Sequence, residues 1–109
     1  MAYVLLDHCV SRKFARLLPG HEVVTCREME FESLSNGRLL EAALKAGFGA
    51  LLTVDKNIPF QQSASLPLPV IVVDSIGNSV QALAPYAPSV LKLLTLPLER
   101  RAHLIPRRL

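Results

Sequence analysis

The sequence predicts an α/β protein with a three-layer α/β/α arrangement and a parallel four-stranded sheet in the order 2-1-3-4. Four short runs rich in Val, Ile and Leu, at 3–6, 22–26, 50–54 and 70–73, fit strands that are buried on both faces of a parallel sheet. Stretches with apolar residues at helical spacing alternate with these runs. Because parallel strands need right-handed crossover connections, this alternation indicates βαβ units.

Local signals place the elements along the chain. Pro19-Gly20 ends a helix expected at 10–18, and Ser35 is suited to cap a second helix that ends at Gly47. The segment 56–69 is polar and contains prolines, which is typical of a loop with one helical turn at most. After the fourth strand a helical region extends over 78–94, where two prolines indicate a kink or two short helices.

Length and composition are those of one compact domain. The chain has 109 residues, half of them hydrophobic, which excludes a disordered protein and leaves room for a single core. No apolar run approaches the roughly 18 residues that span a bilayer, so a cytoplasmic protein without membrane contact is expected. Cys9 and Cys26 are too few for a disulfide scaffold and are expected to be buried or half-buried thiols.

The positive charge is concentrated at the end of the chain. The net charge is +3, and the excess lies in 97–109, which holds four arginines and one glutamate. We therefore divide the chain into a domain at 1–96 and a basic tail at 97–109. Such a tail attracts nucleic acid or an acidic partner, or serves only solubility.

Three of the expected strands are followed by aspartate. Asp7, Asp55 and Asp74 come directly after the first, third and fourth strands. Since carboxyl ends of neighbouring parallel strands lie about 4.8 Å apart at one edge, Asp7 and Asp55 would repel one another without a cation between them. Oxygen ligands of this kind suit Mg²⁺ or Mn²⁺. Asp74 and Glu32, which leave the same edge, are further candidate ligands, although aspartate at these positions also caps turns.

Cations and amides accompany the two acids. Arg12 and Lys13 follow Asp7 within one helical turn, and Lys56 and Asn57 follow Asp55 directly. Such groups are suited to hold phosphate, although each base alone is also typical of an ordinary solvated surface.

Four stretches together carry a resemblance to a known family. They are VLLD at 4–7, FARLLPGHEVVT at 14–25, LSNGRLL at 34–40 and LLTVDKN at 51–57. In this combination, over roughly residues 3–95, the chain resembles the small PIN-like proteins that look like ribonuclease toxins of bacterial toxin–antitoxin pairs.

The resemblance implies a PIN fold that binds Mg²⁺ or Mn²⁺ and cleaves single-stranded or structured RNA. Asp7 and Asp55 match the family's acids, and with Lys56 they would be the catalytic residues. Arg12, Lys13 and Asn57 would contact substrate. A cognate antitoxin and a second copy of the chain, forming a homodimer, are the partners that the resemblance implies.

The chain departs from the family's pattern at one position. Asn36 stands at the start of the second helix, where such proteins often have a third acid. Asparagine brings no charge and binds a divalent cation more weakly, so Asn36 is expected to contact substrate or metal only weakly. Glu32 or Asp74 would have to compensate for the missing acid.

Two other functions remain open from the sequence. The run DKNIP at 55–59 resembles the phosphoacceptor loop of a bacterial receiver domain, with Ser75 at the position of a switch hydroxyl. A receiver needs a fifth strand followed by lysine, and the sequence predicts neither. The other possibility is a PIN-like binding protein that has lost activity and uses exposed leucines near the end of the chain to bind a partner.

Overall fold

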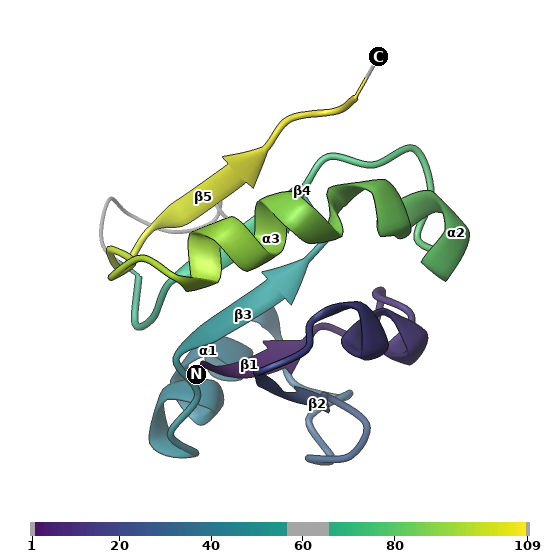
Figure 1. Cartoon of the computed structure of the whole chain (residues 1–109). Coiled ribbons are helices and arrows are strands. Elements are labelled where there is room, and N and C mark those ends of the chain that lie inside the picture. The colour runs from purple at the N-terminus through teal and green to yellow at the C-terminus, as the bar shows by residue number, and fades with distance from the viewer. Residues whose placement is uncertain (1, 57–65, 109) are drawn as a thin grey trace.

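The computed structural model of the protein describes residues 2–56 and 66–108 and contains a five-stranded parallel sheet (Figure 1). The strand order is β2-β1-β3-β4-β5. The strands are β1 (Tyr3–Leu6), β2 (Glu22–Thr25), β3 (Ala50–Thr53), β4 (Val70–Val73) and β5 (Ala102–Ile105). The α/β class and the predicted order of the first four strands are confirmed. The predicted number of strands was wrong, because β5 adds to the edge beside β4.

The fifth strand differs from the others in its burial. β3 and β4 are buried at every position, whereas only Ile105 of β5 is buried and Leu104 is largely exposed. An edge strand needs a less continuous apolar run than a central one, and arginines flank this strand on both sides. For that reason the sequence pattern does not reveal β5, and it predicts only a basic tail at 97–109.

The helices are short, and the one predicted at 10–18 differs in type from an α-helix. They are η1 (a 3₁₀ helix, Arg12–Leu17), α1 (Asn36–Lys45), α2 (Val80–Leu83), η3 (a 3₁₀ helix, Ala84–Tyr86) and α3 (Ala87–Leu94). The region predicted as a helix at 10–18 is thus a 3₁₀ helix. Pro85 and Pro88 lie in the first turns of η3 and α3, where the missing backbone N–H costs no helical hydrogen bond. Gly47, with φ of +90°, follows the end of α1 as predicted.

Two apolar clusters are formed by alternate residues of the strands. Val4 and Leu6 of β1 belong to the cluster that contains Phe14 of η1 and side chains of α2 and α3. Leu5, between them, belongs to the cluster that contains Leu40 and its neighbours on α1. Since side chains of a strand point alternately to its two faces, both faces of the sheet are covered by apolar side chains.

In residues 2–56 and 66–108, no helix combines the length and the apolar character needed to cross a lipid bilayer.

Candidate functional site

The register of the central strands places Asp7 and Thr53 side by side. Leu6 of β1 is paired with Leu52 of β3, so the next residues, Asp7 and Thr53, both lie at the carboxyl edge of the sheet. The backbone N–H of Asp7 donates to the carbonyl oxygen of Leu52 at 2.9 Å, which continues the ladder by one step. The site therefore begins where the two strands stop.

The carboxylate of Asp7 is almost completely buried and is held on both oxygens. Only 2% of the residue is exposed. Its Oδ2 accepts a hydrogen bond from the Thr53 hydroxyl at 2.8 Å and lies 3.7 Å from the Cys9 sulfur. Its Oδ1 accepts from the His8 backbone N–H at 2.8 Å and lies 3.0 Å from His8 Nδ1. A carboxylate that is removed from water needs such partners, and these fix its orientation.

Thr53 connects Asp7 to the second candidate acid. Its Oγ1 donates to Asp7 and accepts the backbone N–H of Asp55 at 3.0 Å. The hydroxyl thus binds the carboxylate of Asp7 and the backbone of Asp55, and Asp55 is half-buried at the end of β3. Thr53 was missed as a functional residue by the sequence analysis. The feature of the sequence that could have indicated Thr53 is a hydroxyl side chain within an aliphatic strand, two residues before Asp55.

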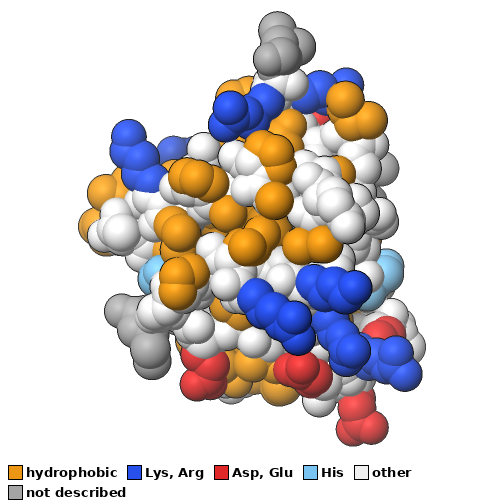
Figure 2. Space-filling view, turned by 45° about the vertical axis from the view of Figure 1, so that its right-hand side comes forward, with side chains coloured by type: hydrophobic (Ala, Val, Ile, Leu, Met, Phe, Trp, Pro, Cys, Tyr) orange, Lys and Arg blue, Asp and Glu red, His pale blue; other side chains and the backbone are white. Residues whose placement is uncertain are grey.

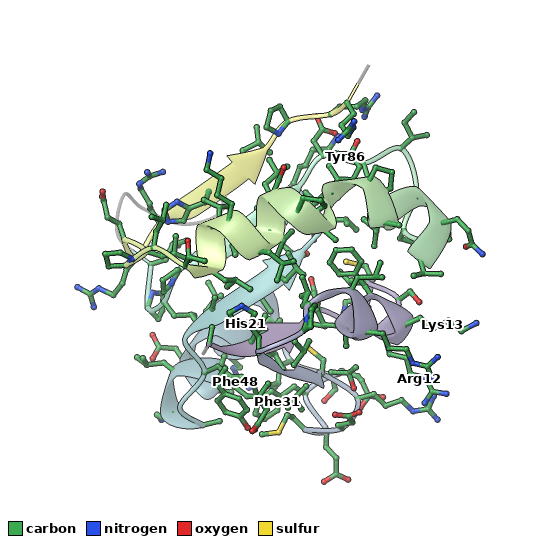
Figure 3. All side chains as sticks on the ribbon, in the orientation of Figure 1. Arg12, Lys13, His21, Phe31, Phe48 and Tyr86 are labelled. Carbon is green, nitrogen blue, oxygen red and sulfur yellow. The ribbon has the colours of Figure 1, made fainter. Side chains whose placement is uncertain are left out.

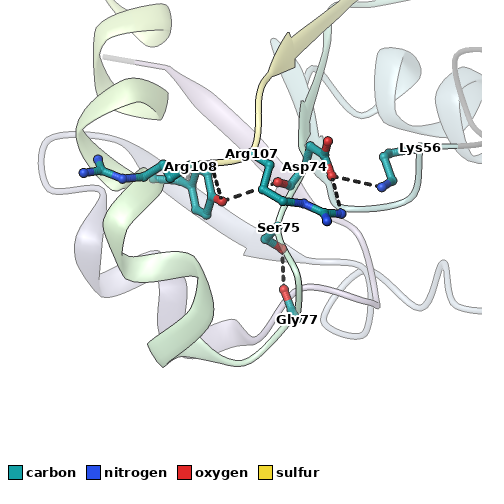
Figure 4. Close-up of polar contacts among 7 residues, drawn as sticks. Lys56, Asp74, Ser75, Gly77, Arg107 and Arg108 are labelled. Atoms are coloured by element: carbon teal, nitrogen blue, oxygen red, sulfur yellow. Dashed lines mark hydrogen bonds and ion pairs between the residues drawn. The ribbon is translucent and has the colours of Figure 1, made fainter.

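Asp74 lies at the same edge but has different neighbours. Its Oδ1 accepts from Lys56 Nζ at 2.9 Å and from Arg107 Nη2 at 3.1 Å (Figure 4). The hydrogen bond from Lys56, followed by the one from Arg107, holds the pKa of Asp74 below its usual range. Asp74, predicted as a metal ligand, is thus bound by two cationic side chains.

The remaining predicted residues are placed around this edge or apart from it. Arg12 and Lys13 extend outward from η1 (Figure 3) and, with Arg16, line a surface hollow of about 390 Å³. Figure 2, which turns this side of the molecule forward, shows several basic side chains close together. Glu32 is exposed in the segment after β2. Asn57 lies outside the described residues, and of Asn36 only its place at the start of α1 is described.

The acid pair fits a hard divalent cation in the type of its donors. Among the described residues, no group of three or more His, Cys, Asp or Glu side chains is arranged to hold a metal ion. Asp7 and Asp55 supply two carboxylates at the ends of β1 and β3, while the Thr53 hydroxyl is engaged by Asp7 and by the backbone N–H of Asp55. Mg²⁺ is commonly held by one or two carboxylates, with water and substrate phosphate completing its coordination. Two protein ligands are therefore enough for such an ion.

The two thiols beside the site are poor nucleophiles. Burial raises the pKa of Cys26 to about 12, and burial also raises the pKa of Cys9, which contacts Thr53 and Asp7. Both cysteines are therefore protonated at neutral pH, and thiolate chemistry is not expected here.

Because both thiols are protonated at neutral pH, we expect thiol reagents to modify Cys9 and Cys26 slowly in the folded protein. At pH 8 the thiolate fraction of Cys26 should be roughly a thousandfold below that of an ordinary thiol. Reaction with an aromatic disulfide reagent, followed by absorbance, should be slow in buffer and rapid in guanidinium chloride. Rapid reaction of both thiols in the folded protein would contradict the protonated state.

Comparisons of the chain with protein-family models, with curated proteins and with solved structures find no match.

Proposed function

We propose that the protein is an Mg²⁺- or Mn²⁺-dependent endoribonuclease with a PIN-like three-layer α/β/α fold, of the kind that serves as a toxin in bacterial toxin–antitoxin pairs. The observation that carries this proposal is that Thr53 Oγ1 donates to the carboxylate of Asp7 and accepts the backbone N–H of Asp55. Both acidic residues therefore lie at the carboxyl edge of two adjacent parallel strands, and that edge is where such sheets bind their ligands.

Each residue has a distinct part in the proposed reaction. Asp7 and Asp55 would hold the cation, and Thr53 keeps the buried carboxylate of Asp7 in a fixed orientation. When bound, the cation supplies an acidified water and stabilises negative charge on phosphate oxygens. Lys56, directly after Asp55, offers its ammonium group to a phosphate at the same edge. The burial of Asp7 excludes competing water from one side of the site.

Calorimetric titration with Mn²⁺ tests the metal site without depending on activity. The wild-type protein should give a saturable heat, and Asp55→Asn should remove most of it because one of two charged ligands is lost. Glu22→Gln is the matched control, since it removes an exposed carboxylate at the opposite end of the sheet. Equal and negligible heats for the wild type and Asp55→Asn would remove the metal hypothesis.

The fifth strand favours a second candidate function, that of a receiver-like phosphoacceptor. The order β2-β1-β3-β4-β5 is also that of flavodoxin-like folds, and it supplies the strand whose absence from the predicted fold counted against a receiver. Asp55 and Ser75 follow β3 and β4, while Arg107 rather than lysine follows β5. Covalent labelling of Asp55 by acetyl phosphate, together with absent RNA cleavage, would favour this function.

A further inference from the structure

A cluster of three charged side chains lies next to the acid pair and has no part in metal binding as proposed above. It consists of Lys56, Asp74 and Arg107, which come from the ends of β3, β4 and β5. Figure 4 shows both cations converging on one carboxylate oxygen of Asp74. We call these three residues the edge cluster.

The strand register sets the edge cluster beside the candidate metal site. Thr53 of β3 is paired with Val72 of β4, and Val73 is paired with Ile105 of β5. The backbone N–H of Asp74 donates to the carbonyl oxygen of Ile105 at 2.9 Å. Because neighbouring strands are about 4.8 Å apart, the edge cluster lies one strand further along the edge that carries Asp55.

The edge cluster has a surplus of positive charge that faces solvent. One carboxylate is shared by two cations, and Lys56 and Arg107 are 48% and 43% exposed, whereas Asp74 is 24% exposed. An ammonium group has three donors and a guanidinium group has five. Among residues 2–56 and 66–108, the contacts with Asp74 occupy one donor of each cation, which leaves further donors for an anion there.

Arg107 is anchored by the backbone on both sides. Before it, β5 is paired with β4; after it, the backbone N–H of Arg108 donates to Tyr86 Oη at 3.1 Å. That hydroxyl lies 3.4 Å from the carbonyl oxygen of Asp74, to which it donates. An exposed ion pair alone adds little to the stability of the fold. The anchored backbone, however, lowers the conformational entropy that Arg107 loses when it binds a ligand.

We propose that Lys56 and Arg107 form a subsite for a backbone phosphate of single-stranded RNA, adjacent to the phosphate that a cation bound by Asp7 and Asp55 would hold. Asp74 acts in this subsite as a positioning residue that orients both cations. This inference rests on the proposed function for the identity of the substrate, but its test measures binding without metal and without cleavage.

The test is the salt dependence of RNA binding. A fluorescent single-stranded oligoribonucleotide is titrated with protein in EDTA, and the logarithm of the affinity is plotted against the logarithm of salt concentration. Arg107→Gln and Lys56→Gln should each weaken binding and reduce the slope by about 0.7, which is the value for one phosphate contact on a single strand. Arg107→Lys keeps the charge and should retain most of the slope.

Arg100→Gln provides the matched control. Arg100 lies two residues before β5, as Arg107 lies two residues after it, so it occupies the opposite end of the strand. This substitution removes the same charge and should change the slope little. An equal loss of slope for Arg100→Gln and Arg107→Gln would overturn the subsite in favour of diffuse attraction by the basic segment.

The Asp74→Asn variant distinguishes two effects on RNA binding, namely the orientation of Lys56 and Arg107 by Asp74 and the net charge of the protein. The substitution makes the protein more positive, so charge alone predicts tighter RNA binding. The positioning role predicts weaker binding, with the Mn²⁺ heat unchanged because this role assigns the Asp74 carboxylate to Lys56 and Arg107 rather than to the cation. Tighter binding, or loss of the Mn²⁺ heat, would overturn this role. Unfolding midpoints of all variants exclude loss of fold as the cause.

The outcomes also separate this inference from the proposed function. Metal-independent RNA binding that depends on Arg107, without any cleavage in Mn²⁺, would support the subsite and contradict the nuclease. Cleavage of RNA by an Arg107→Gln variant whose binding matches the wild type would support the nuclease and contradict the subsite.

Discussion

The Asp7→Asn variant should cleave single-stranded RNA about 100-fold more slowly than the wild type in the presence of Mn²⁺, or more slowly still. Asparagine has nearly the shape of aspartate, and its single side-chain oxygen can still accept the hydrogen bond from Thr53. Its NH₂ group then replaces the oxygen that accepts from the His8 backbone N–H, so the substitution removes the negative charge and one hydrogen bond while keeping the size of the side chain. The measurement is the initial rate of cleavage of a labelled oligoribonucleotide under single-turnover conditions.

Glu22→Gln is again the control, because its carboxylate is exposed on β2 at the amino end of the sheet. Its cleavage rate should equal that of the wild type. An undiminished rate in a folded Asp7→Asn variant would show that the buried acid takes no part in the reaction. A wild-type rate that is insensitive to EDTA would likewise contradict a metal-dependent nuclease.

The second large effect concerns stability. Leu40 of α1 is fully buried in the cluster that contains Leu5 and Leu51, so Leu40→Ala leaves a cavity as well as losing buried apolar surface. We expect the free energy of unfolding to fall by about 2–5 kcal/mol. Urea denaturation followed by circular dichroism measures this change.

Leu44→Ala is a closely matched control for Leu40→Ala. Leu44 lies one turn further along α1 and is 47% exposed, so the same substitution should cost less than about 1 kcal/mol. The comparison keeps the helix, the residue type and the change in helix propensity the same. Equal destabilisation by the two substitutions would mean that α1 does not bury Leu40 as described.

The central strands of the sheet could be predicted from the sequence. The runs at 3–6 and 70–73, and the run at 50–54 apart from Thr53, are apolar because both faces of the sheet are covered, and β2 was also recognised. The βαβ alternation predicted parallel strands, and placing the first strand in the centre of the sheet predicted the order of the first four. β5 could not be recognised in the same way, because its exposed Leu104 and flanking arginines break the apolar pattern.

The sequence indicated where the two acids lie in the fold but not what surrounds them. Asp7 and Asp55 follow adjacent parallel strands as expected, and their part in a metal site stays a prediction. The partner of Asp74 could not be foreseen, since Arg107 lies 33 residues away and reaches it only through the pairing of β4 with β5. No local spacing indicates a contact of this range, and the same holds for Thr53 with Asp7, 46 residues apart.

The central place of the first strand has a consequence for how the chain folds. β1 is synthesised first but lies between β2 and β3, and its pairing with β3 joins Val4 to Ala50. The chain loses the entropy of closing this long loop before the contacts between the two strands stabilise it. We therefore expect folding to be slow relative to that of a helical bundle of similar size. Until β3 emerges from the ribosome, the aliphatic edge of β1 has no partner on that side and is a point at which chaperones or aggregation compete with folding.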